Sequence, residues 1–226
     1  MVSGKSVKLV IVGDSAFAQV AHEYFENDSS YQVVGFSVES PYLHRRDLMG
    51  LPVVPFETVQ EVFPPSEHHL FVATAYTQLN RLRTRLYLLA KDKGYELARY
   101  VSNRAFLSKS ASIGEHCFIF EGNVIQPFVQ IGNNVILWSG NHIGHHSVIK
   151  DNVFISSHVV IAGFSEIGEN SFLGVNAAVS NNTKVARDCW VGPGITIIKD
   201  TKPAELYRPT HPDPSKVDTL RFFKVQ

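Results

Sequence analysis

The strongest constraint on the fold is a period of six residues that runs through the second half of the chain. From Val101 to Ile197, every sixth position holds Val, Ile or Leu. Two positions before most of these lies a small or β-branched side chain, and glycine often follows, as in Ile143-Gly144. Six-residue strands with tight corners, three to a coil, wind a chain into a triangular prism filled by the aliphatic stack. The period therefore predicts a parallel β-helix.

The two cysteines of the chain fit the interior of this prism. Cys117 and Cys189 each fall two positions before an aliphatic residue of the series, so we expect both thiols to be buried. Two cysteines so placed form neither a disulfide framework nor a Cys-x-x-Cys metal site, which fits a reducing compartment. We therefore expect a cytoplasmic protein without redox chemistry.

The first hundred residues alternate between strand and helix patterns. The expected strands are Val7–Val12, Tyr31–Val38, His69–Ala75 and Glu96–Val101, and the expected helices begin at Ala16 and cover Phe56–Val62 and Gln78–Lys93. This alternation predicts a Rossmann-like parallel sheet with helices on its faces. We therefore expect an α/β domain over residues 1–100, the β-helix over residues 101–202 and a tail over residues 203–226.

Sheets of this kind bind ligands at the carboxyl ends of their strands. The substrate-binding residues expected there are Gly13, Asp14, Ser15, Ser37, Glu39, Thr74 and Tyr76. The first turn has one glycine where a dinucleotide fingerprint has three, so NAD binding is not favoured. The free N–H groups at the start of the helix after Ser15 can still bind a phosphate or diphosphate.

Composition argues against two classes of partner. The chain has 21 basic and 21 acidic side chains and 19% charged residues, which gives no electrostatic footprint for nucleic acid or an anionic membrane surface. The longest apolar runs, such as Val7–Val12, are far shorter than the roughly 20 residues that cross a bilayer. We therefore expect small-molecule ligands, without nucleic acid or membrane.

Four of the ten histidines, His142, His145, His146 and His158, fall within one short stretch of the repeat. Imidazole is the side chain best suited to accept a proton near neutral pH, so this cluster is a candidate general base. Two alternatives remain: surface histidines at a corner, and zinc held between subunits, although the pair five residues apart that is typical of such zinc sites is missing.

The repeat places particular residues above this cluster, because successive coils are 18 residues apart. His145 should lie below Gly163 and Asn181, and His142 below Val160 and Ala178. A glycine above the candidate base leaves space beside it. Ala162-Gly163 would then let a long, thin ligand such as a pantetheine arm lie against the backbone.

Nearly the whole chain resembles bacterial sugar acyltransferases of the sialic-acid O-acetyltransferase and bacillosamine N-acetyltransferase type. The resemblance is carried by an α/β domain followed by a left-handed β-helix, and by the segments Asn141–Ile149, Val160–Gly163 and Phe172–Asn176. The family's catalytic histidine corresponds to His145. An acidic residue usually follows it, and this chain has His146 there.

The resemblance implies transfer of an acetyl group from acetyl-CoA, or from a close acyl-CoA, to the amine of a nucleotide-linked deoxyamino sugar for surface glycan biosynthesis. It implies a homotrimer with shared active sites and no metal. The candidate site residues are His145 and His146 for catalysis, His142 and the strand-end residues for the sugar nucleotide, and Ala162, Gly163, Ala178 and Asn181 for the acyl-CoA. The alternatives are a sugar O-acetyltransferase and a non-catalytic trimer that binds a nucleotide sugar.

A trimer is also expected from the surface of a lone prism, which would expose outward apolar side chains. The residues expected on these exposed faces are Trp138, Phe154 and Phe164.

Overall fold

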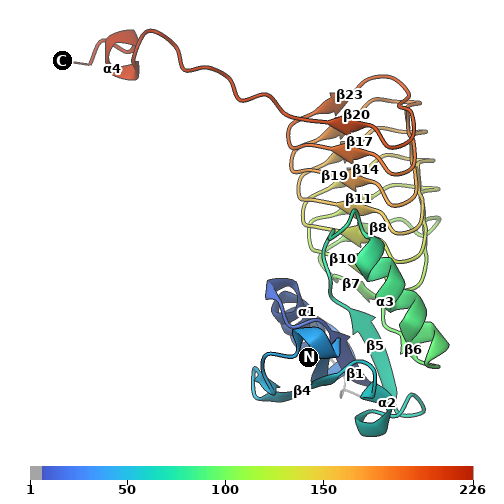
Figure 1. Ribbon diagram of the computed structural model, residues 1–226. Helices are drawn as coiled ribbons and strands as arrows, with labels where there is room; N and C mark the ends of the chain where they lie inside the picture. The colour runs from blue at the N-terminus through green and yellow to red at the C-terminus, as the bar shows by residue number, and fades with distance from the viewer. Residues whose placement is uncertain (1–6, 226) are drawn as a thin grey trace.

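The computed structural model describes residues 7–225 and shows a small α/β domain followed by a parallel β-helix (Figure 1). The coils of the β-helix stack into a column, the α/β domain lies beside the first coils, and the C-terminal segment extends away from the last coils. The predicted fold class, a Rossmann-like sheet followed by a left-handed parallel β-helix, is confirmed. Residues 1–6 of the expected α/β domain lie outside the described residues.

The α/β domain is built on a six-stranded sheet in the order β3-β4-β2-β1-β5-β6. Its strands are β1 (Val7–Val12), β2 (Tyr31–Val38), β3 (Asp47–Leu48), β4 (Leu51–Pro55), β5 (His68–Val72) and β6 (Glu96–Leu97), and its helices are α1 (Ala16–Asp28), the 3-10 turn η1 (Ser40–Tyr42), α2 (Val59–Val62) and α3 (Arg81–Asp92). The last four residues of β1 are buried, as expected for a central strand whose sheet is covered on both faces.

One strand pair of this sheet was not predicted. Residues 47–55, expected as part of a loop, form the antiparallel β3–β4 pair, and β4 joins the sheet parallel to β2. The turn consists of Met49 and Gly50, with φ of 56° and 78°, the positive dihedrals that a two-residue hairpin turn requires. Methionine gives no sequence signal for this conformation, which explains why the hairpin was missed.

The helix expected from Gln78 begins three residues later, at Arg81. Gln78, Leu79 and Asn80 all have left-handed φ, so they form a turn instead of helix. Asn80 Nδ2 donates to the carbonyl oxygen of Asn170 at 2.9 Å, and this contact with the β-helix holds the turn. Because Asn170 is distant in sequence, local patterning could not show where the helix begins.

The β-helix has three faces, each a parallel sheet. The first face contains β7 (Tyr100–Val101), β10 (Phe118–Ile119), β13 (Ile136–Leu137), β16 (Phe154–Ile155), β19 (Phe172–Leu173), β22 (Trp190–Val191) and β24 (Leu206–Tyr207). The second face contains β8 (Phe106–Leu107), β11 (Val124–Ile125), β14 (His142–Ile143), β17 (Val160–Ile161), β20 (Ala178–Val179) and β23 (Thr196–Ile197). The third face contains β9 (Ser112–Ile113), β12 (Gln130–Ile131), β15 (Val148–Ile149), β18 (Glu166–Ile167) and β21 (Lys184–Val185). Residues paired in adjacent coils are 18 apart in sequence, as predicted, except between β22 and β24, where they are 16 apart.

The interior of the prism is the aliphatic stack that the period predicts. Ile143, Ile161 and Val191 are fully buried in one cluster, which also contains both cysteines. Cys117 and Cys189 have no exposed surface, so the prediction that they are interior is confirmed. Burial raises the pKa of the Cys117 thiol to about 12, which keeps it protonated at neutral pH.

The α/β domain packs against the first face. Phe17 of α1 lies edge-on to Phe118, with ring centroids 5.7 Å apart, and Tyr76 lies 4.6 Å from Phe172. Phe154 is 3% exposed and Trp138 packs against the same cluster. The expectation that Trp138 and Phe154 lie on exposed faces is therefore wrong, because the chain's own α/β domain covers them.

A buried polar cluster also joins the two regions. The fully buried Arg83 donates from Nη2 to the carbonyl oxygens of Asn134 and Asn152, at 3.2 and 3.0 Å. The Val72 N–H donates to His116 Nε2 at 2.8 Å. Burial lowers the pKa of His116 to about 3, so this ring is neutral at physiological pH. Burial also lowers the pKa of Arg83, to about 9, which leaves the guanidinium charged.

The tail first adds β24 to the first face, beside β22. It then extends away from the column and ends in the short helix α4 (Thr219–Phe222) (Figure 1). Leu220 and Phe222 of this helix are exposed. No helix within residues 7–225 is long and apolar enough to cross a bilayer.

Candidate active site

Two adjacent histidines occupy a corner of the β-helix between β14 and β15. We call the line of corners between the second and third faces the histidine edge; it comprises residues 126–128, 144–146, 162–164 and 180–182. His145 and His146 are both exposed. The His145 N–H donates to Gln126 Oε1 at 2.9 Å, which ties this corner to the preceding coil.

The following coil leaves room for the His145 ring because residue 163 is glycine. A Cβ atom on Gly163 would lie 2.8 Å from His145 Cε1 and 3.0 Å from its Nε2, so the ring lies against the backbone there. The neighbouring N–H groups of Ala162 and Phe164 donate to Val179 and His145 carbonyl oxygens. The Gly163 N–H makes no hydrogen bond within residues 7–225. Gly163 itself is buried beneath the His145 ring, so a ligand at this point would meet the exposed imidazole.

The His146 ring is enclosed by aromatic rings of the same edge. Its centroid lies 4.7 Å from that of Phe128 and 4.7 Å from that of Phe164, and it is nearly parallel to Phe164. His146 Nδ1 lies 3.1 Å from His145 Nδ1, within hydrogen-bond distance. The two histidines therefore form a pair, with the His145 ring over Gly163 and the His146 ring between Phe128 and Phe164.

The other candidates of the β-helix divide between this edge and its surroundings. Ala162 is half-buried and Asn181 is exposed, both on the histidine edge. His142 and Ala178 are half-buried on the second face, beside the edge and in the expected register. His158 lies at the corner between the first and second faces and is not part of this group.

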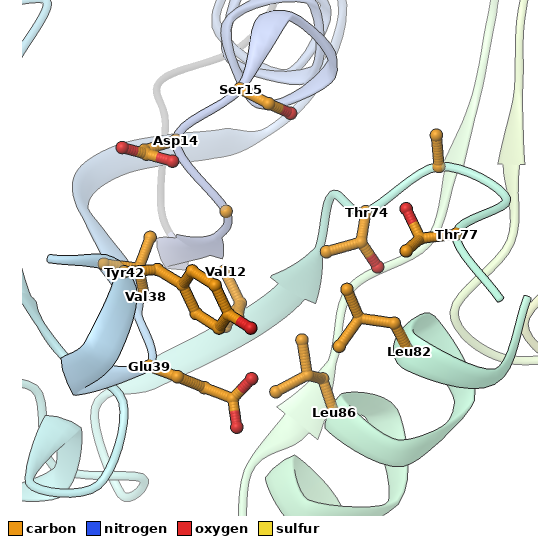
Figure 2. A pocket seen from close by; sticks show the side chains of 12 residues that line it. Val12, Asp14, Ser15, Val38, Glu39, Tyr42, Thr74, Thr77, Leu82 and Leu86 are labelled. Atoms are coloured by element: carbon orange, nitrogen blue, oxygen red, sulfur yellow. The ribbon is translucent and has the colours of Figure 1, made fainter.

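A second candidate subsite is a cavity of about 390 Å³ in the α/β domain (Figure 2). The side chains that line it come from the ends of β1, β2 and β5, from η1 and from α3. The lining residues are Val12, Gly13, Asp14, Ser15, Val38, Glu39, Tyr42, Thr74, Ala75, Thr77, Leu82 and Leu86. A mostly apolar cavity with a few polar groups, at the carboxyl end of a parallel sheet, is typical of a small-molecule site.

The charged groups of the cavity are already paired. The Arg85 guanidinium donates to both Glu39 carboxylate oxygens, at 2.7 and 2.8 Å, and this bond raises the pKa of Arg85. Arg45 lies 3.4 Å from the Asp14 carboxylate. Thr74 Oγ1 is buried and has no hydrogen-bond partner among the described residues. Because a buried hydroxyl without a partner is destabilising, Thr74 is suited to bind a ligand.

The turn at Gly13 brings the start of α1 to the cavity. Gly13 has φ of 125°, and a Cβ there would lie 2.9 Å from the Ala73 carbonyl oxygen. Glycine is therefore needed both for the turn and for the close approach of β5. Ser15 is the N-cap residue of the 13-residue helix α1, so free backbone N–H groups face this end of the cavity.

The structure does not place two of the expected substrate contacts in the cavity. The Ser37 side chain is fully buried, and its carbonyl oxygen accepts the Gly13 N–H at 2.8 Å. Tyr76 lies beyond β5 and packs on Phe154 and Phe172 of the first face. Side chains alternate along a strand, which directs Ser37 into the core, and docking of the two regions draws Tyr76 away.

Sequence reasoning missed several residues of the cavity wall. Tyr42 lies in η1, directly after Pro41, and Leu82 and Leu86 belong to α3. The spacing of Leu82 and Leu86 places them on one face of that helix, a signal that could have assigned them to the sheet side. Nothing local to Tyr42 or Thr77 indicates a ligand contact.

No group of three or more His, Cys, Asp or Glu side chains arranged to hold a metal ion occurs in the part of the chain that the structure describes.

The chain is similar to transferases in sequence and in structure. Residues 110–145 match the family described as bacterial transferase hexapeptide (six repeats). PerB from Caulobacter crescentus, solved with CoA and GDP-perosamine, has a TM-score of 0.79 and 26% sequence identity, and the match covers 91% of this chain and 94% of that chain. This chain is an acyltransferase. The sequence predicted that this chain resembles bacterial sugar acyltransferases, and these matches confirm it.

Two further solved structures share the fold of the acyltransferase. The acetyltransferase domain of PglB from Neisseria gonorrhoeae FA1090 has a TM-score of 0.79 at 22% identity, covering 88% of this chain and 95% of that one. WeeI from Acinetobacter baumannii AYE has a TM-score of 0.55 at 18% identity, covering 84% and 95%. No curated protein matches the acyltransferase in sequence.

Proposed function

We propose that this acyltransferase moves an acetyl group from acetyl-CoA to the amine of a nucleotide-linked deoxyamino sugar, with His145 as general base. The observation that carries the proposal is the position of the His145 ring over Gly163. The comparison supports it, because the chain is 26% identical over most of its length to a protein whose structure holds CoA and GDP-perosamine. Among the described residues of the histidine edge, His145 is the exposed imidazole whose ring lies over a glycine of the next coil.

The α/β cavity is the proposed site of the nucleotide. Gly13 and Ser15, at the start of α1, suit the phosphates, because free N–H groups and the helix dipole favour negative charge. Glu39 follows β2, the position from which a carboxylate accepts hydrogen bonds from ribose hydroxyls in related sheets. The unpartnered Thr74 hydroxyl adds a further contact. The sugar would then extend out of the cavity toward its acyl donor.

The position of the cavity favours an active site shared between subunits. The α/β domain covers the first face, whereas the histidine edge is the corner between the second and third faces and therefore lies opposite. A sugar held in the cavity of one subunit would meet His145 of another copy. The exposed Phe106, Val124 and Val160 on the second face are the apolar surface that we propose forms the contact in a homotrimer. Light scattering tests this, since a monomer at micromolar concentration would remove the shared site.

The proposed place of the acyl-CoA is along the histidine edge. Gly163 lies beneath the His145 ring, and Ala162 beside it is half-buried with a small side chain, so a thin pantetheine arm can lie along this edge next to His145, with Ala178 and Asn181 in the next coil.

The proposed reaction is a direct attack in a ternary complex. The sugar nitrogen forms a bond to the thioester carbonyl carbon while its proton moves to His145 Nε2. The carbon–sulfur bond then breaks, and the CoA thiolate takes the proton from His145. Both cysteines are interior, so an acyl-cysteine intermediate is not part of the mechanism.

The test is release of free thiol from acetyl-CoA with a panel of nucleotide-linked sugars. The panel contains matched pairs that differ only in carrying an amine or a hydroxyl at one carbon. Turnover with the amine member supports the proposal. Turnover only with the hydroxyl member would replace it with O-acetylation, and binding of the sugars without thiol release would leave a non-catalytic nucleotide-sugar protein.

A further inference from the structure

The contact between the two histidines of the edge limits which proton positions are compatible with catalysis. His145 Nδ1 and His146 Nδ1 are 3.1 Å apart, and a hydrogen bond between two neutral imidazoles needs a proton on one of these nitrogens and a lone pair on the other. Both His145 nitrogens lie close to Gly163, but Nδ1 faces His146, and Nε2 is the nitrogen without a hydrogen bond among the described residues. For Nε2 to accept a proton, the His145 proton must be on Nδ1, and His146 Nδ1 must be the acceptor.

We propose that His146 is the positioning residue of the reaction, accepting a hydrogen bond from His145 Nδ1–H and so keeping Nε2 free to act as the base. This inference rests on the proposed role of His145. It assigns to a neutral imidazole the role that a carboxylate has in many histidine-based sites, namely to fix the tautomer and the ring orientation of the base. When His145 takes the proton of the sugar amine at Nε2, the same hydrogen bond stabilises the imidazolium.

The structure holds His146 in a fixed place, as a positioning residue requires. Its backbone φ is 60°, its N–H donates to the Pro127 carbonyl oxygen at 3.1 Å, and its ring lies between Phe128 and Phe164. The backbone of His145 is held as well, by Gln126. The two imidazoles are nearly perpendicular, with an interplanar angle of 88°, so the lone pair of one Nδ1 can point at the other.

The side chains recorded against the two rings leave no other acceptor for His145 Nδ1. Within residues 7–225 these are Gln126, Phe128 and Phe164. None of the three titrates, and Gln126 Oε1 accepts the His145 backbone N–H instead.

A purely structural role for His146, as one ring in an aromatic stack, is the alternative to be tested. His146→Phe keeps the stack but removes the acceptor, and the left-handed backbone tolerates it because Phe128 and Phe164 have φ of 64° and 58° at equivalent corners. His146→Asn removes the ring but keeps an acceptor oxygen, on a residue type that often adopts this conformation. The two variants therefore separate stacking from hydrogen bonding.

The experiment measures kcat and KM for both substrates in these variants and in His145→Ala. We expect His146→Phe to lower kcat by about 10- to 100-fold, as loss of an orienting partner typically does, with KM for acyl-CoA unchanged, and His146→Asn to retain most of the rate. Wild-type kcat in His146→Phe together with loss in His146→Asn would overturn the inference in favour of stacking. Full activity in His145→Ala would instead overturn the proposed base.

The pH profile gives a second, independent readout. In His146→Asp the acceptor is a carboxylate, which stabilises the protonated form of His145 more than a neutral ring does. The acidic limb of the kcat profile should therefore move to higher pH in His146→Asp than in wild type. An unchanged acidic limb in an active His146→Asp variant would show that residue 146 does not interact with the base, and the inference would fail.

Discussion

The α/β cavity and the histidine edge are built in different ways. The cavity is formed by segments that follow the ends of strands, and its charged groups are already engaged, Glu39 with Arg85 and Asp14 with Arg45. The histidine edge is formed by one corner repeated every 18 residues, and His145 there is exposed with its ring over Gly163. Preformed pairs suit the holding of a ligand, whereas an exposed imidazole suits proton transfer.

This difference predicts that substitutions in the two places change different kinetic constants. A residue that binds ground state and transition state equally affects KM, and a residue that acts only as bonds change affects kcat. The proposed division of labour is therefore open to direct measurement.

The largest expected effect is that of His145→Ala. A general base typically contributes 10²- to 10⁴-fold, so kcat should fall by about that factor, while the affinity for acetyl-CoA measured by calorimetry stays nearly unchanged. The value of kcat should fall less in His142→Ala. It should fall least in His158→Ala, because His158 lies at a different corner. A residual rate above about a tenth of wild type would remove His145 from the role of base.

The next effect concerns the joint between the two regions. The pKa of His116 is lowered from 6.5 to about 3 by burial, so between those values the unfolded chain binds a proton that the native ring does not. The free energy of unfolding should therefore fall with decreasing pH, by up to about 1.4 kcal/mol per pH unit from this group. Urea titrations at pH 7, 6 and 5 measure it, and replacement of the exposed His158 by alanine provides the control. An unfolding free energy whose pH dependence is the same in wild type and His116→Gln would contradict the assignment.

A smaller effect is expected at the cavity. Glu39→Gln removes the charge that Arg85 holds and weakens the proposed acceptor for the ribose, so KM for the nucleotide sugar should rise about tenfold, as for loss of one charged hydrogen bond. The value of kcat should stay within about threefold of wild type, because a residue that binds the ground state and the transition state equally does not change it. Glu57→Gln is the matched control, because Glu57 accepts hydrogen bonds from Ser40 outside the cavity lining. Equal effects of the two variants would count against a ligand role for Glu39.

The smallest effect is expected for the cysteines. Cys117→Ala and Cys189→Ala each remove one buried sulfur and should lower the free energy of unfolding by about 1 kcal/mol. Turnover should stay within a few-fold of wild type because neither thiol reaches either subsite. Loss of turnover in a variant that remains folded would indicate a thioester intermediate and would undo the division between cavity and edge.

The same comparison explains what the sequence could predict. In the β-helix the period fixes both which residues are interior and which lie above one another, so the order of residues alone places Cys117 inside and His145 below Gly163. In the α/β domain the order of strands and helices was predictable, but Tyr42 reaches the cavity, and Arg85 reaches Glu39 of its lining, only through tertiary packing. The repeat encodes its geometry locally, whereas the cavity depends on contacts between distant segments.

Docking of the two regions was the part least accessible from sequence. The repeat predicts that Phe154 points outward from its strand. Nothing near it in sequence shows that Tyr76 covers it. Tyr100 begins the first face of the β-helix, yet its ring packs against Phe25 of α1. This residue therefore contacts both regions, and the domain boundary expected at residue 100 stays a prediction.

The central claim is that the cavity binds and the histidine edge reacts, and a double-variant cycle tests it most directly. Initial rates with both substrates varied are measured for wild type, Glu39→Gln, His145→Ala and the double variant. The account predicts that His145→Ala lowers kcat by the same factor whether or not Glu39 is also replaced. It also predicts that Glu39→Gln raises KM by the same factor whether or not His145 is replaced, because independent sites give additive effects. Wild-type kcat in His145→Ala, or a loss that appears instead as a raised KM for the sugar, would contradict it.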